Sequence, residues 1–94
     1  MNNELTHAIE SLKKGLAQNP THLYCRFNHG VLMFKLGLLH EAKADFLMLS
    51  AIYPKEPMVH FNLGLIYFQL GDYEKSCEPL EFVTKMSLGA LNQF

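Results

Sequence analysis

A stretch of eleven residues occurs twice in this chain, and the two copies are separated by 34 residues. Residues 27–37 read FNHGVLMFKLG and residues 61–71 read FNLGLIYFQLG, so six of the eleven positions are identical. The same offset pairs Pro20 with Pro54 and Ala42 with Ser76. A period of about 34 residues, carried by small and aromatic residues at fixed positions, is typical of helical repeats. We therefore expect an array of helix pairs.

Proline and glycine positions divide the chain into five predicted helices. Asn19-Pro20 ends the first helix, because the residue before a proline is disfavoured in the α conformation. Gly37 and Gly71 end two others, since glycine most readily adopts the left-handed conformation that follows a helix. Pro57 fits the start of the helix over 57–70, and Asp72 fits the start of the helix over 73–87. The predicted helices are 4–18, 22–36, 39–52, 57–70 and 73–87.

The repeat register groups these helices into a single domain, residues 1–88. Its units are a half-repeat over 4–20 and full repeats over 21–54 and 55–88, with a frayed tail expected at 89–94. Gly30 and Gly64 lie inside predicted helices, where glycine costs about 1 kcal/mol relative to alanine. We therefore expect them where two helices cross closely. Pro79 lies inside the last predicted helix and predicts a kink there.

The repeated residues resemble the tetratricopeptide repeat (TPR) family. The family pattern in the second copy is carried by Leu63-Gly64, Tyr67, Gly71-Asp72-Tyr73 and Leu80, and in the first by Gly30, Gly37, Ala42, Phe46 and Pro54. The resemblance implies an all-α fold, an antiparallel helix-turn-helix array of about five helices. It also implies that the first helix of each repeat lines a concave surface, where protein ligands usually bind.

Composition excludes several classes of function. A net charge of −1 with 18% charged residues gives no basic face for nucleic acid. No stretch approaches the roughly 18 apolar residues of a membrane span, and the N-terminus lacks the features of a signal peptide. We therefore expect a cytoplasmic protein whose two cysteines, Cys25 and Cys77, are free thiols.

Catalytic and metal-binding patterns are missing from the sequence. The five histidines include no i,i+4 pair on one helix, so no metal or other cofactor is expected. His29 and His60 are expected to be partly buried and hydrogen-bonded. The acidic residues are scattered and suggest no acid–base pair. We therefore expect a protein that is not an enzyme.

One face of the first helix in each repeat is apolar and aromatic, with one asparagine in each copy. Two interpretations compete: the aromatic residues thicken the core, or they form an apolar groove that binds a peptide or helix of a partner. The groove interpretation makes these residues the partner-binding site. They are Tyr24, Phe27, Asn28, Val31, Phe34, Met58, Phe61, Asn62, Leu65 and Phe68.

The best-known TPR ligand mode, in which lysine and asparagine side chains clamp a terminal carboxylate, does not fit this surface. Phe27 and Phe61 occupy the positions where lysine is needed, and Val31 and Leu65 stand at a clamp asparagine position. Carboxylate recognition needs convergent donors. The sequence does not provide them.

The small size and apolar groove resemble the TPR chaperones and adaptors of bacterial type III secretion, which hold secreted subunits before export. Two alternatives from other classes remain: a structural scaffold segment of a larger TPR protein, and a regulatory module of an enzyme. The last helix carries Phe82, Val83 and Met86 with no following helix to cover them. Three explanations are open: the chain is part of a longer array, a partner covers this end, or the chain forms a homodimer through the C-terminal helix.

Overall fold

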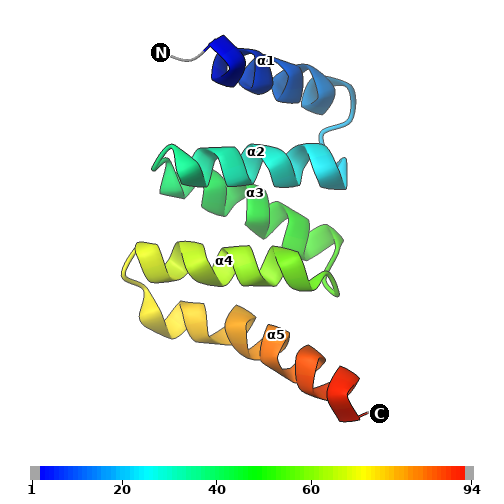
Figure 1. Cartoon of the computed structure of the whole chain (residues 1–94), viewed down its shortest axis with the longest axis vertical. Helices are drawn as coiled ribbons and strands as arrows, with labels where there is room; N and C mark the ends of the chain where they lie inside the picture. The colour runs from blue at the N-terminus through cyan, green and yellow to red at the C-terminus, as the bar shows by residue number, and fades with distance from the viewer. Residues whose placement is uncertain (1–2, 93–94) are drawn as a thin grey trace.

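The computed structural model describes residues 3–92, which form five α-helices stacked one after another along the longest axis of the molecule (Figure 1). The helices are α1 (Asn3–Gln18), α2 (Leu23–Lys35), α3 (Leu39–Ile52), α4 (Pro57–Gln69) and α5 (Tyr73–Asn92). Each helix packs on the next, and α2 also contacts α4. Successive helices run antiparallel, and the stack measures 45 × 28 × 21 Å. The expected all-α helical array is confirmed.

The turns form as the sequence predicts. Gly37 and Gly71 have φ of +80° and +81°, the left-handed conformation, directly after α2 and α4. Pro57 is the first residue of α4, a position whose backbone N–H makes no hydrogen bond within the helix, so proline is tolerated there. The Asp72 carboxylate accepts a hydrogen bond from the backbone N–H of Lys75 at 3.4 Å and caps α5.

The last helix is longer than expected. α5 continues to Asn92, beyond the predicted end at 87 and through four residues of the expected frayed tail; residues 93–94 lie outside the described chain. The single Gly89 costs the helix only about 1 kcal/mol, and no proline follows it. Pro79 lies inside α5 without ending it. Its missing N–H removes the donor that the carbonyl of Lys75 would otherwise have within the helix.

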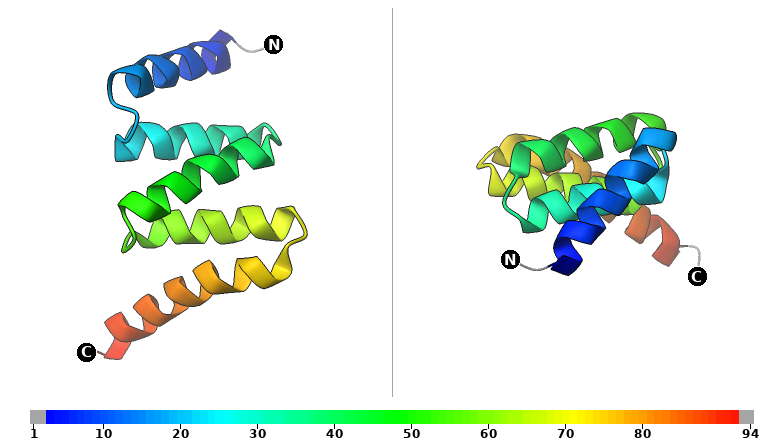
Figure 2. Two further views of the ribbon diagram at one scale, coloured as in Figure 1. Left: turned by 180° about the vertical axis from the view of Figure 1, so that it is seen from behind. Right: turned by 90° about the horizontal axis from the view of Figure 1, so that it is seen from above.

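The hydrophobic core lies between α2, α3 and α4. Viewed from above, α3 lies on one side of the stack, and α2 and α4 lie on the other (Figure 2). Ala42, Phe46 and Leu49 form the inner face of α3, and all three are fully buried. The core cluster is Met33, Ala42, Phe46, Leu49, Val59, Leu63 and Ile66.

Gly30 and Gly64 lie at close helix contacts, as predicted. A Cβ atom placed on Gly30 would lie 2.6 Å from the ring of Phe46 in α3. A Cβ on Gly64 would lie 2.6 Å from Cγ of Leu80 in α5. Both distances are shorter than a van der Waals contact. Only a residue without a side chain therefore allows these helix pairs to approach as they do.

A buried charged cluster joins α2 to α3. Asp45 is only 4% exposed, and its two carboxylate oxygens lie 3.0 Å from Nη1 of Arg26 and 2.6 Å from Nδ1 of His29. Arg26 also donates from Nε and Nη2 to the carbonyl of Pro20, at 3.1 and 2.9 Å. The cluster therefore ties the α1–α2 turn, α2 and α3 together.

His60 donates from Nε2 to the carbonyl of Pro54 at 2.7 Å. His29 and His60 are both partly buried and hydrogen-bonded, as predicted.

The glycine contacts make a prediction about stability. Gly30→Ala pushes a methyl group against the ring of Phe46, which is fully buried and cannot move aside. We expect it to lower the free energy of unfolding by about 1–3 kcal/mol in urea denaturation. Gly64→Ala should cost less, because the half-buried Leu80 can change rotamer. Lys35→Ala, at an exposed position, is the control. Equal unfolding midpoints for Gly30→Ala and Lys35→Ala would contradict this packing.

The charged cluster makes a second prediction. Asp45→Ala leaves Arg26, which is 17% exposed, without its buried counter-ion. We expect a loss of about 3 kcal/mol in the free energy of unfolding, the usual cost of breaking a buried pair. Glu81→Ala is the matched control, because its ion pair with Lys85 is mostly exposed and should contribute under about 1 kcal/mol. Thermal and urea unfolding of both variants measure the difference, and equal losses would show that the cluster does not stabilise the fold.

Candidate functional site

The candidate groove residues occupy one face of α2 and the same face of α4. Residues three, four and seven apart share a helix face, and the 34-residue offset places the two sets in the same register. α2 and α4 contact each other, with α3 packed on both. By this register the two sets lie on corresponding faces of two contacting helices, and we call the surface that they define the α2–α4 face.

The ten residues differ in exposure. The exposed aromatic and methionine side chains are Tyr24, Met58, Phe61 and Phe68, which are 71%, 54%, 40% and 54% exposed. Three residues of the first repeat are instead half-buried against the core: Phe27, Val31 and Phe34. The ring of Phe27 meets that of Phe46 edge-on, with centroids 5.3 Å apart. The first repeat thus contributes more of its aromatic stripe to the core, and the second repeat leaves more of it on the surface.

The remaining three residues lie between these extremes. Leu65 is half-buried and Asn28 is exposed. Asn62 donates from Nδ2 to the carbonyl of Met58, one turn earlier in α4, at 2.7 Å. One donor of this amide is therefore already engaged within its own helix, and the rest of its polar surface is available to a ligand.

Two hollows involve the α2–α4 face. The first, of about 270 Å³, lies between the starts of α2 and α4 and is lined by Leu23, Tyr24, Phe27, Glu56 and Met58. The second, of about 400 Å³, lies between α1 and α2 and is lined by Ala8, Ser11, Leu12, Asn28, Val31, Leu32 and Lys35. Sequence reasoning did not single out Glu56. It precedes the repeated stripe, and only the fold brings it beside Tyr24 and Phe27.

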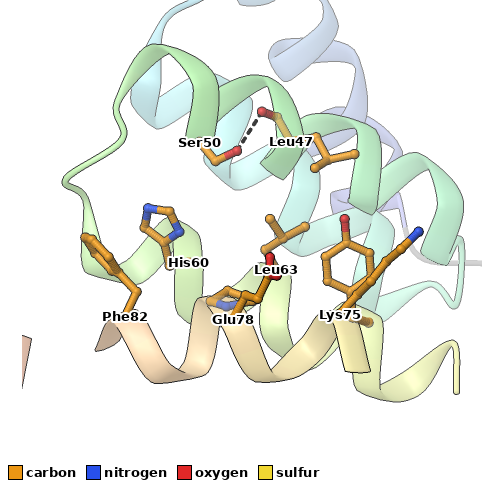
Figure 3. A pocket seen from close by; sticks show the side chains of 9 residues that line it. Leu47, Ser50, His60, Leu63, Lys75, Glu78 and Phe82 are labelled. Atoms are coloured by element: carbon orange, nitrogen blue, oxygen red, sulfur yellow. Dashed lines mark hydrogen bonds between the residues drawn. The ribbon is translucent and has the colours of Figure 1, made fainter. Parts of the chain in front are cut away.

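A larger hollow, of about 570 Å³, lies between α3, α4 and α5 (Figure 3). Its floor includes His60, Leu63 and Tyr67, which at 100° per residue point away from the α2–α4 face. The ring of Phe82 stacks on His60 with centroids 4.1 Å apart. The other lining residues are Leu47, Ser50, Lys75, Glu78 and Pro79.

The repeat register could have indicated this larger hollow, because the two repeats differ at residues that line it. The 34-residue offset maps the charged cluster of Arg26, His29 and Asp45 onto His60, Leu63 and Pro79. The second repeat therefore replaces three interacting polar side chains by residues that do not bond to one another. The space between α4 and α5 is correspondingly less filled.

The described chain offers little for catalysis or metal binding. Within residues 3–92 no three histidine, cysteine, aspartate or glutamate side chains come together in a way that could hold a metal ion. In the same range, no helix is both long enough and apolar enough to span a membrane. Cys25 is half-buried and Cys77 exposed, and both are free thiols.

Comparison with known proteins agrees with the repeat pattern. Residues 59–82 match the family model described as tetratricopeptide repeat. The chain is 27% identical over 78 residues to anaphase-promoting complex subunit 3 of Dictyostelium discoideum, which covers 83% of this chain and 8% of that protein.

Solved structures of MamA have the same arrangement of helices. MamA of AMB-1 superposes with a TM-score of 0.83 at 26% identity, over 93% of this chain and 48% of that one. MamA of MSR-1 gives a TM-score of 0.81 at 25% identity, over 93% and 50%. The chain thus spans about half the length of these MamA chains and a small part of the anaphase-promoting complex subunit. Residues 59–82 thus match a tetratricopeptide repeat within a TPR-like array of helices, and proteins with such repeats are typically non-catalytic modules that bind other proteins.

Proposed function

We propose that the α2–α4 face binds an apolar segment, either an extended peptide or a helix, of a partner protein, and that the chain performs no catalysis. The observation that supports this most is the exposure of Tyr24, Met58, Phe61 and Phe68 on one face. A monomer rarely exposes a contiguous apolar patch without a use for it. Aromatic and methionine side chains are also common anchors of protein interfaces.

The half-buried residues complete the surface. Phe27, Val31 and Phe34 pack against the core and form its floor together with the half-buried Leu65. Asn28 and Asn62 provide polar groups that can orient the backbone of a ligand without a charged contact. An apolar interface of this kind should depend weakly on salt concentration.

A second candidate function is that of a structural scaffold segment within a larger TPR array. Its support is coverage, because the chain spans about half of the MamA chains and 8% of the anaphase-promoting complex subunit. The narrower role expected from the sequence, a chaperone or adaptor of type III secretion, gains no support from these relatives and is not part of the proposal. A cytoplasmic location stays a prediction.

The exposure of the α5 side chains determines which of them are available for the predicted homodimer. Phe82, expected on an uncovered face, stacks on His60 of α4 and is half-buried. Val83 is half-buried, and Met86 is 42% exposed. Self-association through α5 would therefore rely on Met86 more than on Phe82.

The groove proposal makes a prediction that separates binding from folding. Random peptides displayed on phage and selected on the folded chain provide ligands whose affinity can be measured by calorimetry. Phe61→Ala should weaken these ligands by about 2 kcal/mol or more, as for an interface anchor. Its 40% exposure means that the fold should largely survive.

Two controls complete this experiment. Phe46→Ala should lower the free energy of unfolding by about 3–5 kcal/mol, because that ring is fully buried. Phe27→Ala should lower both affinity and stability, because its ring contacts Phe46. Failure of the wild-type chain to select any peptide, or unchanged affinity in Phe61→Ala, would refute the groove.

Self-association has its own test. Sedimentation velocity of the chain at increasing concentration should show a dimer that Met86→Glu disrupts, because a buried charge opposes apolar association. Met48→Glu, at a similarly exposed methionine of α3, should leave the dimer intact. A wild-type chain that remains monomeric at high concentration would contradict self-association.

A further inference from the structure

The hollow between the starts of α2 and α4 combines an apolar wall with a single carboxylate. Leu23, Tyr24, Phe27 and Met58 provide the apolar wall, and among the described residues Glu56 is the only charged one that lines the hollow. At about 270 Å³ it is too small for a helix or a folded ligand and large enough for one long side chain. Whatever enters must therefore match both an apolar wall and a negative charge.

The position of Glu56 is fixed by the turn that carries it. Two side-chain hydrogen bonds hold this turn: Tyr53 donates from its hydroxyl to the carbonyl of Thr21 at 3.0 Å, and His60 donates to the carbonyl of Pro54 at 2.7 Å. The first bond ties the α3–α4 turn to the α1–α2 turn. Glu56 is thereby held beside the first turn of α2 before any ligand arrives.

The carboxylate of Glu56 is not used by the fold. Glu56 precedes α4, but its side chain makes no capping hydrogen bond to that helix. The ion pairs found among the described side chains do not include it. Arg26, a cation of α2, is engaged by Asp45 and Pro20, and the adjacent Lys55 is exposed. Glu56 is half-buried, and its carboxylate can take the cation of a ligand as a partner.

We propose that this hollow binds a lysine or arginine side chain of the partner, with Glu56 as the residue that specifies it. This inference rests on the proposed function of the α2–α4 face and makes it more specific. Lysine and arginine have an apolar stem and a cationic head. The stem packs along Leu23 and Met58, the head pairs with Glu56, and the faces of Tyr24 and Phe27 add cation–π attraction. The partner is thus an apolar segment with a basic residue near one end.

The test uses a random twelve-residue peptide library displayed on phage, selected in parallel on three forms of the folded chain: wild type, Glu56→Gln and Glu74→Gln. Glu74 is an exposed carboxylate of α5 that lines none of these hollows and serves as the matched control. We expect the wild type and Glu74→Gln to enrich apolar peptides with lysine or arginine at one recurrent position. Glu56→Gln should still enrich apolar peptides but without that basic residue.

A binding measurement follows on one selected lysine peptide and its analogue with norleucine, which keeps the stem and lacks the charge. Glu56→Gln should weaken the lysine peptide about tenfold and leave the norleucine peptide nearly unchanged, because the substitution removes only the charge pair. The difference should shrink at high salt.

The outcomes separate the two proposals. Apolar peptides without a recurrent basic residue, or the same basic residue selected by Glu56→Gln, would overturn the role of Glu56 and leave the groove standing. A wild-type chain that enriches no peptide would overturn both. Equal weakening of the lysine and norleucine peptides would show that Glu56 acts on the shape of the hollow and not through its charge, which also overturns the inference.

Discussion

The close approach of α2 and α3 at Gly30 is the contact on which most of the first repeat depends. The missing side chain allows the ring of Phe46 to lie against the backbone of α2. The ring of Phe46 also packs edge-on against the ring of Phe27, with the two centroids 5.3 Å apart. The same approach brings Asp45, the neighbour of Phe46, within reach of Arg26 and His29. One glycine therefore determines an aromatic contact and a buried charged cluster together.

The second repeat has the same close contact between a helix glycine and the next helix, but a smaller side chain fills it. Leu80 stands where the first repeat has Phe46, and it fills the space beside Gly64. No ring lies there to support Phe61 as Phe46 supports Phe27, and Phe61 stays 40% exposed. The charged cluster is also lost, since its positions are His60, Leu63 and Pro79. The repeats are alike in backbone and different in how much of their surface remains open.

Local rules explain how much of this could be predicted. Helix ends followed from glycine and proline, and the glycine contacts followed from the cost of glycine inside a helix. The exposure of the groove residues could not be predicted from their spacing alone, because Phe27 and Phe61 hold identical positions in the repeat. Their difference depends on the residue that packs beneath each of them. The helix expected to end at 87 continues to Asn92, because one glycine without a following proline is too weak to end a helix.

Glu56 was missed for a similar reason. In the sequence it is one of several scattered acidic residues, between a lysine and a proline. Its significance arises because the hydrogen bond from Tyr53 to Thr21 joins two turns that are 32 residues apart. That contact places a carboxylate at one end of an otherwise apolar face. An apolar groove alone attracts ligands with little preference for direction, because hydrophobic contact is non-directional. A single charge at one end makes the two orientations of a ligand unequal, so Glu56, at the start of α4, can set direction while the exposed side chains of α4 provide contact area.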